Sequence, residues 1–138
     1  MSCLYRFGVS LDRNLIEDFD KHIKLDNYKN RSEAIRDLIR EELVRKQWKS
    51  GNIVAGAISI TYNHHKRELV NRLMEIQHDF HNIIISTQHV HLDRHNCLEI
   101  VAVKGKAREV NNLAKKLKSV RGVFHVALNM STTGKDLH

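Results

Sequence analysis

The middle of the chain, residues 83–104, reads IIISTQHVHLDRHNCLEIVAVK and decides the fold. Two runs rich in apolar and β-branched residues, at 83–92 and 97–104, flank a short polar stretch, DRHN. Such a pattern is typical of two antiparallel strands joined by a tight turn. The sequence therefore predicts a β-hairpin in the middle of a domain.

The segments on either side of this hairpin mirror each other. Before it lie a strand-like run at 53–62, IVAGAISITY, and a run with helical apolar spacing at 65–81. After it lie a second helical run at 106–119 and the strand-like GVFHVALNM at 122–130. Apolar spacing of 3.6 residues indicates a helix and strict alternation indicates a strand. The order β-α-β-β-α-β predicts a ferredoxin-like α+β domain, with two helices on one face of a four-stranded antiparallel sheet.

The N-terminal part predicts a different unit. Apolar residues alternate over 4–11, which indicates a short strand, and a helical period begins near Asp12. A second helix is expected from Asn30, because Glu33 follows it at the spacing of a capping arrangement. A lone strand has two unpaired edges, and a second copy of the chain is the simplest partner for it. We therefore expect a ribbon–helix–helix (β-α-α) domain that is paired across a dimer.

The chain of 138 residues is thus expected to divide into a ribbon–helix–helix domain at 1–50, a ferredoxin-like domain at 51–130 and a polar, frayed tail at 131–138. No window approaches the roughly 18 apolar residues of a membrane-spanning helix. No secretory leader is visible, and the two cysteines are too few for a disulfide framework. We expect a soluble, cytoplasmic protein without a membrane partner. The formal charge of +7 favours an anionic partner, and nucleic acid is the commonest.

The hairpin also carries a candidate metal site. His89 and His91 share one face of their strand, because side chains two residues apart do so. A loop of three or five residues would pair His91 with Cys97 and His89 with Glu99, whereas a loop of four would not. Two imidazoles and a thiolate suit Ni(II), Cu(II), Zn(II) or Co(II). Each residue alone would more simply be a solvent-facing histidine or a small buried cysteine; their combination favours a metal site.

Three segments make the sequence similar to the nickel-responsive transcriptional repressors: NRSEAIRD at 30–37, the helix end at Gln77–His78, and the histidine–cysteine hairpin. The similarity extends from Arg6 to the last predicted strand. It implies a ribbon–helix–helix DNA-binding domain and an ACT-like regulatory domain, assembled as a homotetramer (a dimer of dimers). It further implies nickel-dependent binding to a palindromic double-stranded operator, repression of nickel uptake genes, and no enzymatic activity.

The resemblance also implies a ligand set. One Ni(II) per chain would be bound in a planar four-coordinate site by His89, His91 and Cys97 of one chain and His78 of a neighbouring chain. Glu99 would stand beside the ligands and orient them.

The candidate DNA contacts lie in three places. A paired ribbon fits the major groove, and its outward face would carry Arg6, Gly8 and Ser10. Gly8 has no side chain to read a base, so the operator need not match that of relatives. The start of the second helix can hold a phosphate, and the resemblance adds the start of the helix at 65–81. These further contacts are Asn30, Arg31, Ser32, Arg36, Lys66 and Arg67.

Glu33 and Asp37 are like charges one helical turn apart. The resemblance implies that they help to bind a second, hard cation when DNA is bound, and simple solvation of both carboxylates is the alternative.

Three other functions compete with a nickel-dependent regulator. A regulator could respond to Co, Cu or Zn instead. A ribbon–helix–helix protein of the antitoxin type would bind DNA without any metal. A metal enzyme would use three protein ligands and an open position, but the sequence offers no evident general base with a substrate cleft.

Overall fold

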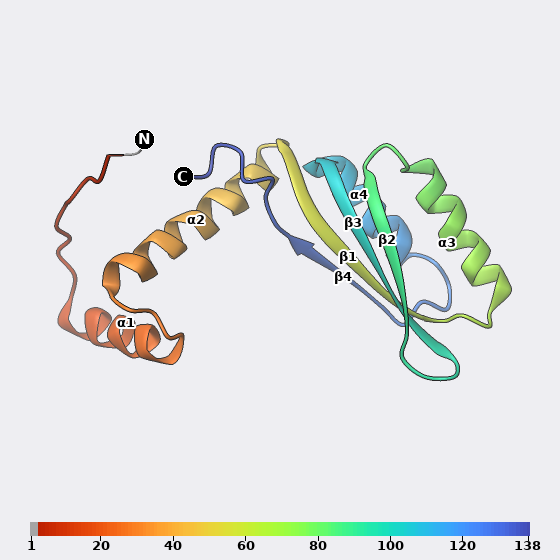
Figure 1. The fold of residues 1–138 in the computed structure, drawn as a ribbon, viewed down its shortest axis with the longest axis horizontal. Coiled ribbons are helices and arrows are strands. Elements are labelled where there is room, and N and C mark those ends of the chain that lie inside the picture. The colour runs from red at the N-terminus through yellow and green to blue at the C-terminus, as the bar shows by residue number, and fades with distance from the viewer. Residues whose placement is uncertain (1–2) are drawn as a thin grey trace. The chain divides into compact units, whose positions relative to one another are not determined.

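The computed structural model describes residues 3–138. They form two compact units, the first reaching to Ile39 and the second running from Arg40 to His138 (Figure 1). Helix α2 contributes to both units. Within the described residues, no helix is long and apolar enough to cross a membrane.

The first unit contains α1 (Arg13–Leu25) and the first part of α2 (Arg31–Lys49). Both helices start where the sequence predicts. The Asn30 side chain accepts a hydrogen bond from the Glu33 backbone N–H at 3.0 Å, which satisfies a donor that the first helical turn leaves free. The Glu33 carboxylate reaches back to the backbone N–H of Lys29 at 3.4 Å. The capping arrangement predicted for this helix is therefore present.

The predicted strand at 4–11 does not form in the single chain, where residues 3–12 belong to no helix or strand. A strand exists only through hydrogen bonds to a neighbour, and one chain offers none here. The apolar side chains of this segment are strongly exposed, including Tyr5 at 87%, Phe7 at 65% and Val9 at 61%. The segment thus presents an apolar row to solvent, which is the surface that pairing with a second copy would cover.

The second unit has the predicted ferredoxin-like order. Its elements are β1 (Ile53–Asn63), α3 (Arg67–Asp79), β2 (Ile84–His91), β3 (Asn96–Lys106), α4 (Ala107–Lys118) and β4 (His125–Met130). The four strands form one antiparallel sheet in the spatial order β2-β3-β1-β4. Figure 1 shows α3 and α4 together on one face of this sheet. This confirms the predicted fold class.

The core lies between the helices and one face of the sheet. Alternate residues of the two central strands are buried there, because successive side chains of a strand point to opposite faces. Helices α3 and α4 close the core with apolar side chains at helical spacing. Its fully buried members include Val54, Ile58, Ile60, Leu73, Ile76, Val101, Val103, Val110, Leu113 and Leu117.

The tail after β4 is anchored rather than frayed, which corrects the expectation for residues 131–138. The indole N–H of Trp48, 6% exposed, donates to the Ser131 carbonyl at 2.9 Å. The Thr132 hydroxyl donates to the Gln47 side chain at 2.9 Å. A buried tryptophan needs an acceptor for its N–H, and the tail supplies it. Polar composition alone does not predict fraying where a buried donor needs a partner.

Candidate metal centre and DNA-binding residues

The hairpin has the register that the metal motif requires. His91 pairs with Cys97 and His89 pairs with Glu99 across β2 and β3. The Leu92 N–H donates to the Asn96 carbonyl at 2.9 Å, so only three residues form the turn. This is the odd loop length that places both histidines on the same sheet face as the cysteine. The predicted register is confirmed.

Asp93 closes this turn. One oxygen of its carboxylate accepts the backbone N–H groups of His95 and Asn96, both at 2.8 Å, and the other accepts the Asn96 amide at 2.9 Å. These bonds favour the charged carboxylate and hold the pKa of Asp93 at about 2, below its ordinary value. The side chain therefore fixes a turn whose length sets the register of the site.

We expect acid to loosen this turn in a defined window. Because the folded-state pKa of Asp93 is lowered, its contribution to stability is present above about pH 4 and is lost as the pH falls towards 2. Between pH 5 and pH 2 the midpoint temperature of thermal unfolding should fall more steeply for the wild type than for Asp93→Asn. The asparagine keeps an acceptor oxygen without the titrating charge. Asp93→Ala should be less stable throughout. Parallel pH profiles for wild type and Asp93→Asn would contradict this role.

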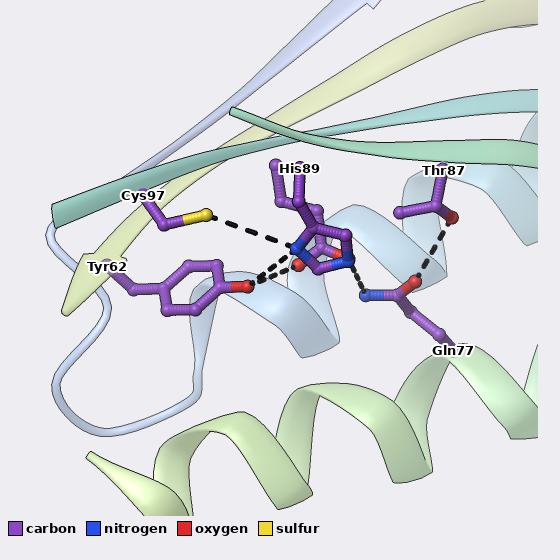
Figure 2. Close-up of polar contacts among 6 residues, drawn as sticks. Tyr62, Gln77, Thr87, His89 and Cys97 are labelled. Atoms are coloured by element: carbon purple, nitrogen blue, oxygen red, sulfur yellow. Dashed lines mark hydrogen bonds and ion pairs between the residues drawn. The ribbon is translucent and has the colours of Figure 1, made fainter. Parts of the chain in front are cut away.

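The buried thiol and one imidazole already lie close together (Figure 2). The Cys97 Sγ is 4.0 Å from the His89 Nδ1. Cys97 is 1% exposed, whereas the His89 side chain remains 57% exposed. Tyr62 pairs with Cys97 from β1 on the other side, and its hydroxyl lies 3.5 Å from the same His89 nitrogen. The sheet thus holds the buried sulfur beside a half-exposed imidazole.

Glu99 is a buried carboxylate, 3% exposed, beneath His89. It accepts the Tyr62 hydroxyl at 2.9 Å and the Gln77 amide at 2.8 Å, and its Oε1 lies 3.5 Å from the His89 Nε2. Thr87 donates to the Gln77 carbonyl oxygen at 3.4 Å (Figure 2). The network therefore connects β1, β2 and β3 to α3, which ends close to Gln77. It holds His89 by the ring nitrogen opposite the one near the thiol.

Tyr62 acts in this network as a donor. Burial, together with the adjacent carboxylate of Glu99, raises the pKa of Tyr62 far above its ordinary value. The phenol therefore keeps its proton at physiological pH and donates it to Glu99.

The other two predicted ligands point elsewhere in the single chain. The His91 ring stands edge-on to the His64 ring, with centroids 5.0 Å apart. The His78 ring stacks on His81 at 5.9 Å, at the end of α3. Within residues 3–138 of one chain, no three His, Cys, Asp or Glu side chains are grouped so that they could hold a metal ion. The backbone register is set, but one chain does not assemble the site.

The residues nevertheless fit a borderline transition metal by their chemistry. A buried sulfur and an imidazole nitrogen lie together, and a second imidazole sits opposite the sulfur on the neighbouring strand. Such nitrogen and sulfur donors suit nickel, copper, zinc or cobalt. A carboxylate next to a ligating histidine commonly fixes the orientation of its ring, and the buried Glu99 has that position relative to His89.

The predicted DNA contacts of the first unit lie on exposed positions. Arg6, Gly8 and Ser10 all belong to the exposed segment before α1. Arg31 is already engaged: its guanidinium forms two hydrogen bonds with the Asp20 carboxylate, at 2.9 and 2.8 Å. Asn30 is used as the helix cap. Asn30 and Arg31 therefore have partners within the chain, whereas Arg6, Gly8 and Ser10 lie in an exposed segment outside any helix or strand.

The remaining predicted contacts are also exposed. Ser32 and Arg36 lie in the first two turns of α2, and Lys66 and Arg67 begin α3. The carboxylates proposed for a second cation have partners in the chain itself. Asp37 accepts a short hydrogen bond from the Tyr28 hydroxyl, and Glu33 accepts the Lys29 N–H. These bonds account for both side chains without a cation.

Sequence reasoning did not single out Tyr62, Gln77 or Thr87 as site residues. Tyr62 reaches the site because β1 lies beside β3, and it pairs directly with Cys97. Strand order in a sheet is not visible in apolar alternation, so only the ferredoxin-like order itself could have pointed to this residue. Gln77 precedes His78, and its position on α3 was the available signal.

Comparisons with known proteins agree with the domain that the sequence predicts in each half of the chain. Residues 55–131 match the family model described as "NikR C terminal nickel binding domain". Residues 5–46 match the model described as "Ribbon-helix-helix protein, copG family". The second unit and the ribbon–helix–helix segment are therefore each similar to a known domain, in the order that the sequence predicts.

Full-length relatives and one solved structure extend this result. A "Putative nickel-responsive regulator" of Chlorobium limicola is 63% identical over 97% of this chain and 100% of its own length. One of the same name from Chlorobaculum tepidum is 64% identical over 96% of this chain and 98% of its own. An uncharacterised Thermotoga maritima protein aligns with 56% of this chain and 95% of its own, at a TM-score of 0.51 and 15% identity. That last likeness concerns the fold alone.

Proposed function

Because the chain belongs to the family of nickel-responsive regulators, which join a ribbon–helix–helix domain to a NikR C-terminal nickel-binding domain, we propose how its residues perform nickel-dependent DNA binding. Each chain binds one Ni(II) through His89, His91 and Cys97, and His78 of a neighbouring chain completes the set. The assembled protein is a homotetramer that binds a palindromic operator and represses nickel uptake genes.

The hairpin register is the observation that carries the ligand assignment. It places His91 opposite Cys97 and His89 opposite Glu99, with the thiol 4.0 Å from one imidazole nitrogen. Bound nickel would supply a positive charge that stabilises the thiolate. Glu99 orients His89, and the Tyr62 and Gln77 donors in turn hold the Glu99 carboxylate in place.

The single chain supports a ligand from a second chain, because its own donors do not complete a metal site within the described residues. His78 stands at the end of α3, and within the described residues it is not grouped with two other donors. The exposed apolar side chains before α1 also lack a surface that buries them from water within the single chain. We infer that two kinds of contact build the tetramer: ribbons pair the first units, and the metal ligands connect the second units.

DNA binding uses the exposed segment of the paired ribbon. Arg6 is the one long donor among its predicted outward residues, and Ser10 adds a hydroxyl. Phosphate contacts from Arg36, Lys66 and Arg67 hold the protein in register on the duplex. We place a second cation at Glu33 and Asp37 only in the DNA-bound state, where it would replace the partners that these carboxylates have in the chain.

The test is reciprocal coupling between nickel and operator. By linkage, DNA must tighten nickel binding by the same factor that nickel tightens DNA binding, typically about 5- to 150-fold. We expect titration calorimetry to show tighter nickel binding when operator DNA is present. The double variant Lys66→Ala with Arg67→Ala should reduce this gain. It removes the proposed phosphate contacts at the start of α3, the helix whose other end carries the nickel ligand His78.

Other outcomes would assign a different function. Operator binding that is identical with and without any metal would favour the antitoxin-type alternative. Coupling that appears with Co(II), Cu(II) or Zn(II) but not with Ni(II) would keep the mechanism and change the metal.

A further inference from the structure

The second unit has two neighbouring cavities away from the metal hairpin, where β1 begins and β3 ends. Their volumes are about 710 and 530 Å³. Gly51 and Lys106 line both, so the cavities adjoin each other. The last residues of α2, the start of α4 and the anchored tail supply the rest of the walls.

The lining of both cavities is strongly basic. One carboxylate, Asp136, accompanies six cationic side chains. Within the part of the chain that the structure describes, none of the six forms an ion pair. The six are Lys49, Lys104, Lys106, Arg108, Lys115 and Lys135.

Such a lining is suited to an anion with several charges. Like charges gathered around a recess repel one another, and a bound polyanion relieves that repulsion. Sites for uncharged small molecules are lined mainly by apolar side chains. Here Ile53 and the largely buried Trp48 are the only large apolar members of the lining. Amides and hydroxyls of the remaining lining residues, such as Asn52 and Thr133, add neutral donors.

The walls are fixed by hydrogen bonds that do not use the cationic groups. The Ala107 N–H donates to the Asn52 carbonyl at 3.1 Å, which ties the start of α4 to the start of β1. The Gln47 amide donates to the Lys135 carbonyl at 3.5 Å, which holds the tail against α2. Gly51, at φ +74°, makes the turn between α2 and β1 that an L-residue would strain. The cationic side chains are therefore left free over a stable frame.

We propose that the two cavities bind the phosphate backbone of DNA, as a sequence-independent contact separate from the residues of the first unit and from Lys66 and Arg67. This inference rests on the DNA binding proposed above. Two open recesses side by side accommodate neighbouring phosphates of one strand better than a compact ligand. Once the first units hold DNA, the same duplex is also present at high effective concentration near the second units.

The experiment measures binding to a duplex that lacks the operator, as a function of salt. Affinity for DNA falls as salt rises, and each lost phosphate contact should reduce the magnitude of the slope of log affinity against log salt by about 1. Lys106→Gln with Arg108→Gln should therefore reduce the slope by about 2 and weaken operator and non-operator DNA by equal factors. The matched control, Lys118→Gln with Arg121→Gln, removes the same charge at and just beyond the far end of α4 and should leave the slope unchanged.

Trp48 provides a local reporter, because it is the only tryptophan of the chain and lines one cavity. Its fluorescence should change when non-operator DNA binds wild type and change less in the Lys106/Arg108 variant. Equal slopes for the two double variants would overturn the proposal, even where nickel-dependent operator binding is intact. A Trp48 response to inorganic tripolyphosphate but not to DNA would also overturn it and would assign the cavities to a small polyanion. If the wild type with nickel does not bind operator DNA at all, the proposed function itself is contradicted.

Discussion

Nickel added to Cys97→Ser should give no thiolate-to-metal charge-transfer band, whereas the wild type should give one that saturates at one Ni(II) per chain. A serine hydroxyl stays protonated at neutral pH and is a poor ligand for a metal that favours nitrogen and sulfur donors. Cys97 is buried, so the substitution changes a single atom in an otherwise closed environment. An ultraviolet–visible titration measures the band directly.

Cys3→Ser is the matched control, because it removes the only other thiol, which is exposed. It should leave the band unchanged, and a band that survives Cys97→Ser but not Cys3→Ser would refute the ligand assignment. His78→Ala should keep a thiolate band but lower nickel affinity and shift the spectrum, since three donors of the hairpin remain. Binding should weaken in acid for all variants, because thiol and imidazoles must lose protons to bind.

For the DNA-reading surface, Arg6→Ala should cost about 1–3 kcal/mol of operator affinity, roughly 5- to 150-fold, and should relax sequence preference. Arginine binds the guanine edge with two hydrogen bonds, and the neighbouring outward positions, Gly8 and Ser10, cannot replace it. A gel-shift comparison of operator and random DNA separates base reading from charge.

The control for this experiment is Arg36→Ala, which removes an exposed guanidinium at a predicted phosphate contact. It should weaken operator and random DNA alike. If Arg6→Ala produces that same uniform loss, Arg6 contacts phosphate and the base-reading role belongs to another residue.

The fold of the second unit could be predicted because its signals are local. Alternating apolar residues mark the strands, helical spacing marks α3 and α4, and the polar stretch after His91 marks the turn. The pairing of His91 with Cys97 could be predicted only for a turn of three or five residues, because side chains alternate along a strand. The structure supplies the turn length and with it that pairing.

The features that the sequence could not supply depend on distant parts of the chain or on a second chain. Tyr62 joins the site only because β1 lies next to β3. Trp48 holds the tail because its buried N–H needs an acceptor that lies more than eighty residues away in sequence. The segment before α1 lacks the neighbour that would make it a strand, so its alternation describes an assembly rather than a monomer. The six cations of the basic cavities are scattered over 49–135 and form no run.

The three-residue turn closed by Asp93 has a consequence for how this hairpin can diverge between species. Inserting or deleting one residue there would move His89 and His91 to the opposite sheet face, away from Cys97, unless a bulge restored the alternation. A change of two residues would keep the faces as they are. The residues at the tip other than Asp93 are therefore free to drift in identity, while the length of the tip is expected to evolve in steps of two.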